Sequence, residues 1–247
     1  MTMLQVVRAV AAQLGIAPGR CRHCLERQAE TSLGLCNHCA GAFAPRTGGY
    51  CSRCGEVFAL ADEPPRLCSA CLHRPPPFSA TFLYGVYDGA LQETIIQYKY
   101  HGRHSVERLL QGLLLQAYAG GRTRLAGPWP AHDCVVPMPL HPGRLRERGF
   151  NQSLELARPL AAAHRIPLLA QGLARSRATA PQAGFSRVQR QENVRDAFTV
   201  PRSALLAGQR VLLVDDVMTT GATAAAAAWA CLQAGAARVD CCVLARA

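Results

Sequence analysis

The strongest constraint on the fold is the string VLLVDDVMTTGAT, which runs from Val211 to Thr223. Its apolar start predicts a buried strand over residues 209–214. The residues after Asp215 and Asp216 are small or carry hydroxyls, and they lead into an alanine-rich helix predicted over 223–233. A strand, turn and helix in this order bring the turn to the carboxyl edge of a parallel sheet, where open α/β folds bind ligands.

The turn has the chemistry of a ribose phosphate site. Adjacent carboxylates at Asp215 and Asp216 can accept hydrogen bonds from the 2- and 3-hydroxyls of a ribose, or hold Mg²⁺. The hydroxyl and N–H groups that follow can surround a phosphate at the positive end of the helix. These phosphate-binding candidates are Thr219, Thr220, Gly221, Ala222 and Thr223. Two acids alone would fit an ordinary surface turn, but the full string is more specific, and it matches neither the Walker loop nor the dinucleotide fingerprint.

The rest of the chain after residue 75 alternates strand-like and helix-like segments. Strands are predicted at 80–87, 133–138, 173–175 and 238–244, and helices at 91–99, 105–118 and 151–163, the last capped by Asn151. This alternation predicts an α/β fold with a mostly parallel sheet that is covered on both faces. The Pro75–Pro77 run marks its boundary with a different kind of sequence.

Before that boundary the chain carries four C-x-x-C pairs. They are Cys21/Cys24, Cys36/Cys39, Cys51/Cys54 and Cys68/Cys71. Each pair can point two thiolates at one metal ion, and two pairs complete a tetrahedral sulfur site, the geometry that zinc prefers. Sulfur at all four positions leaves none for water, so two structural zinc sites are predicted. Sequential and interleaved pairing both remain open. The other cysteines, at 134, 231, 241 and 242, fall in core-like segments.

Positive charge gathers in the second part of the chain. The formal net charge is +11, and residues 141–210 hold twelve Arg against four acids. The segment VPMPLHPGRLRERGFNQ is predicted as a loop at the same sheet edge, where Arg144, Arg146 and Arg148 would clamp a pyrophosphate. Residues 175–198 form a second long basic segment, predicted as a lid or binding loop. A solvated surface is the alternative for both. Lys99 is the sole lysine, and either function or chance accounts for it.

These motifs resemble two known groups. The 211–223 string is similar to the signature of type I phosphoribosyltransferases, which bind phosphoribosyl pyrophosphate (PRPP) with magnesium; the resemblance implies that Asp215 and Asp216 hold the ribose and that 219–223 hold the 5-phosphate. Together with the C-x-x-C pairs, RPPPF, YKYHGR and RATAPQAGFSRVQRQENVRDAF, the whole order resembles the ComF family of competence proteins. That resemblance implies a double zinc ribbon, a phosphoribosyltransferase-like domain and a part in DNA uptake at the cytoplasmic side of the inner membrane.

Three parts are therefore expected: an amphipathic helix over 1–20, a double zinc ribbon over 21–74 and a phosphoribosyltransferase-like domain over 75–247. The first segment lacks a cleavage site, and no apolar run is long enough to span a bilayer, so a cytoplasmic protein is expected, peripheral to the membrane at most.

Three functions remain in competition. The first is a transferase in which Asp215 and Asp216 stabilise the charge that develops on the ribose of PRPP. The second is a factor that binds single-stranded DNA, although 6% aromatic residues argue against an extended base-stacking platform. The third is a module whose zinc ribbons dock a helicase-like uptake ATPase.

Overall fold

The computed structural model describes residues 20–26, 33–100, 104–124, 131–176 and 197–247. All but Arg20 of the predicted helix over 1–20, and most of the predicted lid over 175–198, lie outside these residues. The strands are β1 (Thr81–Val86), β2 (Cys134–Pro137), β3 (Ala174–Arg175), β4 (Phe198–Thr199), β5 (Arg210–Met218) and β6 (Arg238–Arg246). The helices are α2 (Asn37–Ala42), α3 (Ser69–His73), α4 (Gly89–Tyr100), α5 (Glu107–Arg124), α6 (Pro142–Arg148), α7 (Gln152–His164) and α9 (Ala222–Gln233), with 3-10 turns at His104–Val106 and Ser203–Leu205.

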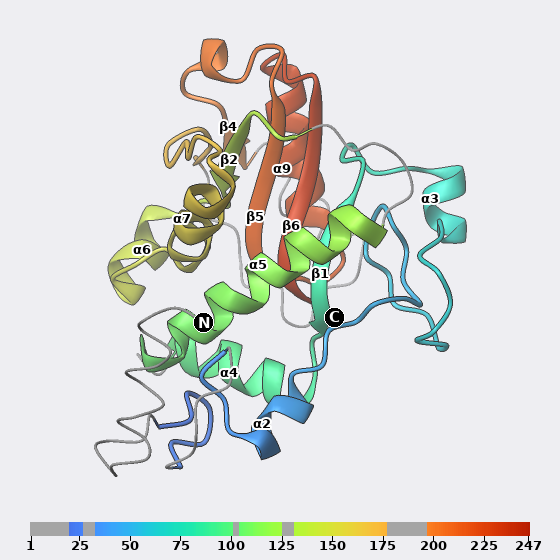
Figure 1. The fold of residues 1–247 in the computed structure, drawn as a ribbon. Helices are drawn as coiled ribbons and strands as arrows, with labels where there is room; N and C mark the ends of the chain where they lie inside the picture. Colours follow the sequence, from blue (N-terminus) through green and yellow to red (C-terminus); the bar gives the residue numbers. More distant parts are fainter. Residues whose placement is uncertain (1–19, 27–32, 101–103, 125–130, 177–196) are drawn as a thin grey trace.

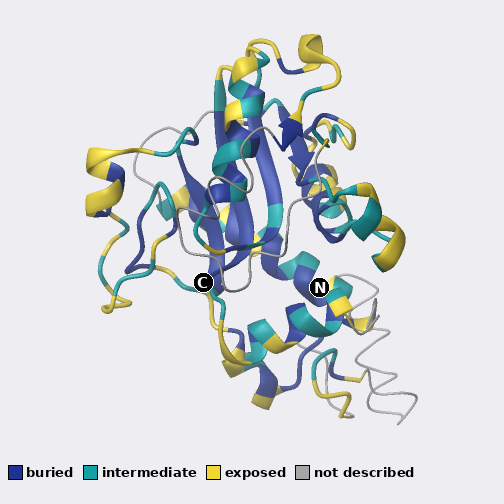
Figure 2. Cartoon of the chain, turned by 180° about the vertical axis from the view of Figure 1, so that it is seen from behind, coloured by how far each residue is buried: buried dark blue, intermediate teal, exposed yellow. Residues whose placement is uncertain are grey.

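The main sheet has four parallel strands in the order β1-β6-β5-β2. Helices α5 and α7 pack on one face and α9 on the other (Figure 1). Figure 2 shows the strands as a continuous buried layer between these helices. The prediction of an α/β fold with a mostly parallel, doubly covered sheet is confirmed.

The residue pattern of each element explains its place in these layers. On β5, Leu212 and Val214 join the core beneath α5 and α7, whereas Leu213 joins the core beneath α9, as the alternation of a strand requires. Helix α9 turns a stripe of small residues to the sheet, at positions 224, 227, 228 and 231. Because these side chains are short, the helix axis can approach the sheet closely.

Two boundaries differ from the predicted ones. Strand β5 does not end at Val214 but continues through the acidic pair to Met218, because β6 pairs with it as far as Met218 and Arg246. The segment over 142–148 is helix α6, not a loop: the His141 side chain accepts a hydrogen bond from the N–H of Gly143, Pro142 fits the first turn, and Gly149 ends the helix in the left-handed conformation.

The predicted strand over 173–175 is only β3, a two-residue strand. It pairs antiparallel with β4 and forms a separate ribbon outside the main sheet. Strand β4 of this ribbon packs beside α9.

The cysteine-rich segment packs directly against the sheet domain. Cys21, Cys36 and Cys39 belong to the same buried cluster as the core residues of α5. Figure 1 shows α2 beside α4 and α3 at a distance from both, beyond β1. Within the described residues, no helix combines the length and apolar character needed to cross a bilayer.

Candidate functional site

The end of β5 is open on one side, and this opening forms the site. Strand β2 pairs with β5 only as far as Pro137 and Val214, after which the N–H of Met138 bonds to the carbonyl of Val214 at 2.8 Å. The next residue is Pro139, which has no N–H to continue the ladder. The four residues from Asp215 to Met218 therefore pair with β6 alone, and their other side faces a cavity.

The turn from β5 into α9 has the geometry of a phosphate-binding loop. Gly221 is the N-cap residue of α9, with φ 78° and ψ 0°, a conformation that favours glycine. The hydroxyl of Thr220 accepts a hydrogen bond from the N–H of Ala222 at 3.3 Å. Helix α9 has twelve residues, so its N-terminus presents a substantial positive dipole end to the cavity.

The two aspartates have different surroundings. Oδ1 of Asp215 accepts hydrogen bonds from Ser153 Oγ and from the N–H of Asp216, both at 2.9 Å. Burial raises the pKa of Asp215 to about 7, and the charge of Asp216 adds to the rise. Asp216 is 4% exposed, and its Oδ2 atom is buried without a hydrogen-bond partner among the described residues. An uncompensated carboxylate oxygen of this kind suits a ribose hydroxyl or a cation.

Lys99 forms an ion pair with Asp216, a contact that the sequence did not predict. Its Nζ lies 2.7 Å from Oδ1 of Asp216, and both side chains are largely buried. Burial lowers the pKa of Lys99, but the charges of Asp216 and Asp215 outweigh this effect and the pKa is raised overall. The sole lysine of the chain, near the end of α4, is therefore a charged member of the site.

A cavity of about 450 Å³ joins these elements. Its lining includes four cationic side chains and two carboxylates: Lys99, Arg144, Arg148, Arg175, Asp215 and Asp216. Thr219, Gly221 and Thr223 also line it, whereas Thr220 and Ala222 serve the helix cap at its edge. Because cations outnumber carboxylates, the cavity favours a ligand with several negative charges.

Helix α6 explains why only two of its three arginines reach the cavity. Arg144 and Arg148 are four residues apart and lie on one face, whereas Arg146 is exposed on another. Arg148 is held in place by Gln152, whose Oε1 accepts its hydrogen bond at 2.6 Å. The structure thus brings together two of the three predicted basic residues and leaves the third in solvent.

Arg175 enters the cavity from the β3–β4 ribbon. Its guanidinium lies 5.4 Å from the ring centroid of Phe198 on the partner strand. Burial lowers the pKa of Arg175, and the charge of Arg144 contributes to the lowering. Two guanidinium groups that raise each other's energy in this way create a favourable place for an anion.

The C-x-x-C pairs meet sequentially, which decides between the two open alternatives. One group contains Cys21, Cys24, Cys36 and Cys39, and the other contains Cys51, Cys54, Cys68 and Cys71. Within each group the sulfur atoms lie within 4.8 Å of one another. A tetrahedral zinc site with Zn–S bonds of about 2.3 Å has sulfur–sulfur edges of about 3.8 Å. The Cys24–Cys36 and Cys54–Cys68 sulfur separations of 3.8 and 3.7 Å fit that geometry.

In the second cysteine group the hydrogen bonds favour a thiolate at Cys51, whereas the bond to Cys51 raises the pKa of Cys54 and burial raises the pKa of Cys71. A hydrogen bond from the Cys54 thiol lowers the pKa of Cys51 to about 4, and the Cys51 sulfur also accepts hydrogen bonds from the N–H groups of Cys54 and Cys68 at 3.5 and 3.3 Å. Each of the two groups can therefore hold a zinc ion. The remaining four cysteines are buried in the core, as predicted.

Several members of the site were not predicted from the sequence. Ser153 and Gln152 are at the start of α7, and Arg175 is the first residue of the segment that was predicted as a lid or binding loop. In the segment after β1, Tyr87, Lys99 and Tyr100 also line the cavity. The one available signal was the sole lysine in an arginine-rich chain.

Comparison with known proteins identifies the type of domain and the family of the chain. The family model of the phosphoribosyl transferase domain matches residues 152–247, which contain α7, β5, α9 and β6. The DNA utilization protein YhgH of Salmonella typhi is 36% identical over 180 residues, which cover 73% of this chain and 78% of that protein. Competence protein F of Haemophilus influenzae is 31% identical over 157 residues, 63% of this chain and 68% of that protein.

Among solved structures, the allosteric regulatory enzyme of purine biosynthesis is similar over 60% of this chain and 29% of the chain of that enzyme. The TM-score of 0.37 and the sequence identity of 21% are too low for a comparison of the sites. The two sequence relatives share most of their length with this chain. This chain combines two cysteine clusters with a phosphoribosyltransferase-type domain, and it belongs to the family of the DNA utilization protein YhgH and competence protein F, the ComF family.

Proposed function

We propose that the cavity binds PRPP or a closely related ribose phosphate, and that the protein serves the uptake or use of external DNA. The observation that carries the first part is the convergence of an acidic pair, a helix N-terminus and four cationic side chains on one cavity. The names of its relatives support the second part.

The parts of the ligand can be assigned to parts of the site by charge. The 5-phosphate binds at the N-terminus of α9, where the N–H and hydroxyl groups of 219–223 surround it. The ribose hydroxyls donate to Asp215 and to the unpartnered Oδ2 of Asp216. The pyrophosphate lies against Arg144, Arg148 and Arg175.

Magnesium fits this arrangement as a companion of the ligand. Asp216 has one carboxylate oxygen to offer, because Lys99 already holds the other. When bound, Mg²⁺ neutralises charge on the diphosphate and eases its departure. The chain's own contribution to a transferase reaction would be to orient the ribose and to place Asp215 and Asp216 where positive charge develops.

The zinc sites have a structural role in this proposal, because sulfur atoms fill all four positions of each site. A cytoplasmic location follows from the proposed handling of DNA that has entered the cell. A helicase-like ATPase remains a partner to be tested, with the surface of the cysteine-rich segment as the candidate contact.

Calorimetric titration of PRPP with magnesium into the zinc-loaded protein tests the ligand. We expect saturable binding that the Asp215→Asn/Asp216→Asn variant loses while it keeps both zinc ions and its circular dichroism spectrum. The Glu147→Gln variant is the matched control, because Glu147 is exposed on α6 and does not line the cavity. Equal affinities for the wild type and the double variant would contradict the proposed site.

Single-stranded DNA is the second candidate ligand, supported by the net charge of +11 and by the exposed Arg146 next to the cavity. Binding of an oligonucleotide that weakens steeply with salt and is blocked by PRPP would place the DNA backbone at the same cavity. Binding that PRPP does not affect would assign the DNA to another surface.

A further inference from the structure

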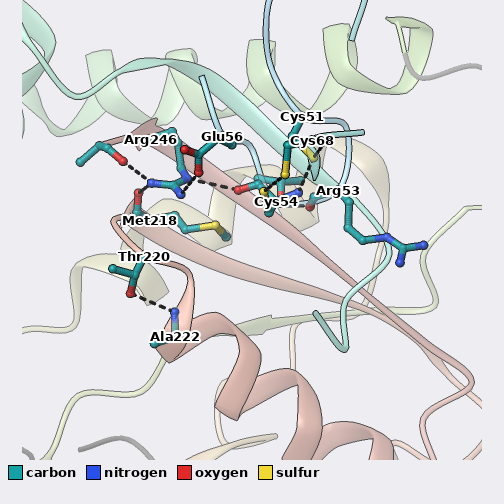
Figure 3. A network of polar contacts seen from close by, with 11 residues as sticks. Cys51, Arg53, Cys54, Glu56, Cys68, Met218, Thr220, Ala222 and Arg246 are labelled. Atoms are coloured by element: carbon teal, nitrogen blue, oxygen red, sulfur yellow. Dashed lines mark hydrogen bonds and ion pairs between the residues drawn. The ribbon is translucent and has the colours of Figure 1, made fainter. Parts of the chain in front are cut away.

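Arg246 lies between the second cysteine group and the phosphate-binding loop. It is the last residue of β6, it is 6% exposed, and its backbone pairs with Met218, the residue that precedes Thr219. Figure 3 shows its guanidinium between the Cys51–Cys54 knuckle and the turn that contains Thr220 and Ala222.

The guanidinium of Arg246 contacts both the cysteine knuckle and the residue that precedes the phosphate-binding loop. Its Nε donates to the carbonyl of Cys54 at 3.2 Å, and its Nη1 donates to the carbonyl of Met218 at 3.4 Å and to that of Ala247. Its Nη2 lies 3.2 Å from Glu56 Oε2. A buried guanidinium needs partners for its donors, so a shift of one carbonyl forces a rearrangement at the others.

The Cys54 carbonyl occupies a position that the knuckle dictates. The N–H of Gly55 bonds to the Cys51 carbonyl at 2.8 Å, and Gly55 has φ 73°. A Cβ at Gly55 would lie 3.1 Å from Leu83 and 3.5 Å from Arg246, so the knuckle sits tightly on the sheet. The hydroxyl of Thr81 on β1 also donates to the carbonyl of Arg53 at 2.6 Å.

The phosphate-binding loop follows Met218, whose carbonyl is the second contact of Arg246. The carbonyl of Met218 accepts both the guanidinium and the N–H of Ala247, the latter at 3.0 Å. Met218 Sδ would lie 3.7 Å from a Cβ at Gly221, so the side chain of Met218 packs against the loop. The position of the Met218 peptide therefore sets the start of the 219–223 turn.

We propose that Arg246 is a positioning residue that couples metal occupancy of the second cysteine group to the shape of the phosphate-binding loop. The inference rests on the proposed function only for the identity of the ligand. Metal at the second group fixes the Cys51–Cys54 knuckle, Arg246 transmits that position to Met218, and the loop takes its binding shape. Because linkage is reciprocal, a bound ligand raises the affinity of the same group for metal by the same factor.

The first cysteine group supplies an internal control. This group packs beside α4 and not beside the phosphate-binding loop. His23 Nδ1 lies 3.1 Å from Thr94 Oγ1 on α4, and the His23 ring contacts Phe43. Thr94 precedes Lys99 by more than one helical turn, so this contact reaches the cavity only through the length of α4. The two metal sites are thus expected to differ in their coupling to the loop.

Amide hydrogen exchange of the full chain tests the coupling without any ligand. We expect peptides that cover 218–223 to exchange faster in Arg246→Met, which keeps both zinc ions, and in Cys54→Ser, which loses the second zinc. Cys24→Ser is the matched control, since it removes the equivalent ligand of the first group and should leave exchange at 218–223 unchanged. Unchanged exchange in Arg246→Met would overturn the proposal, even if Cys54→Ser does not fold.

Zinc release to a chromogenic chelator that ignores magnesium tests the reciprocal effect. At equilibrium with the chelator, PRPP with magnesium should strengthen the binding of one of the two zinc ions by about fivefold or more, within the usual range of coupling between sites. Arg246→Met should lose this effect. Arg246→Lys should keep the charge but not the coupling, because an ammonium cannot hold the two carbonyls in the same fixed geometry.

The outcomes separate the two proposals. If PRPP does not bind the wild type, the proposed ligand is wrong, and the exchange experiment still decides the coupling. If PRPP binds but strengthens the binding of both zinc ions equally or of neither, the role of Arg246 is refuted while the proposed function stands.

Discussion

Replacement of Lys99 by Met tests the feature of the site that the sequence least predicted. The Nζ–Oδ1 distance to Asp216 is 2.7 Å, and the side chains are 14% and 6% exposed. At an effective dielectric of about 20 the attraction is about 6 kcal/mol, part of which is offset by the cost of desolvating both charges. Lys99→Met leaves the buried Asp216 carboxylate without its counter-ion, which should lower the free energy of unfolding by about 3 kcal/mol.

A double-mutant cycle isolates the pair from other effects of the substitution. Asp216→Asn alone leaves a buried ammonium, whereas the Lys99→Met/Asp216→Asn variant removes both charges. Urea unfolding with zinc present should therefore show a double variant more stable than the sum of the single effects predicts, by about 2 kcal/mol. Additive effects within about 0.5 kcal/mol would refute the ion pair.

The same variant should change what the site binds. Without Lys99, the cavity keeps three cationic side chains beside Asp215 and Asp216. Lys99→Met should therefore bind Mn²⁺ alone more tightly than the wild type, because the carboxylates no longer hold a competing cation. Electron paramagnetic resonance of added Mn²⁺ would measure this, and an unchanged affinity would contradict the idea that the charge of Lys99 opposes cation binding at these carboxylates.

Three further predictions concern the same cavity. Arg144→Gln should weaken PRPP binding by about tenfold or more, as expected for a lost charge-assisted contact, whereas Arg146→Gln on the same helix should change it less than twofold; equal losses would show that the face of α6 does not matter. Because the folded-state pKa of Asp215 is raised to about 7, its contribution to stability is lost as pH rises towards 7. The stability of the wild type relative to Asp215→Asn should thus fall by about 2 kcal/mol between pH 5.5 and 7.5, and a flat difference in urea unfolding would disprove the shift. Gly221→Ala should cost about 1–2 kcal/mol through its φ of 78° and not through a clash, since a Cβ there meets its nearest atom at 3.7 Å; a normal melting temperature would contradict this.

Much of the fold was predictable because local signals agreed with the tertiary arrangement. The apolar run before Asp215 predicted β5, and Asn151 predicted the start of α7, where its side chain accepts a hydrogen bond from the N–H of Ser153. The boundaries were less predictable where a neighbour decided them. Strand β5 extends through Asp215 and Asp216 because β6 pairs with it there, and a partner strand leaves no mark in the sequence of β5 itself.

The candidate site was predictable only in the segments that carry a continuous motif. The acidic pair and the turn to Thr223 are adjacent in sequence, so their chemistry could be inferred together. The distinction between Arg144 and Arg146 needed the helical geometry of α6, because in an extended loop the alternate residues would share a face. The pairing of the cysteines needed the folded positions of knuckles whose spacing allowed two arrangements.

The sequence by itself determined the kind of fold, the cysteine ligands available for metal, and the turn that suits a ribose phosphate. These depend on local composition, spacing and periodicity, which the chain carries wherever it folds. Only the tertiary structure decided that Lys99 neutralises Asp216, that Arg175 faces Arg144, and that Arg246 joins a cysteine knuckle to the phosphate-binding loop. These contacts join residues far apart in the chain, and they form because packing against one sheet brings α4, β3, β6 and the cysteine-rich segment to the same edge.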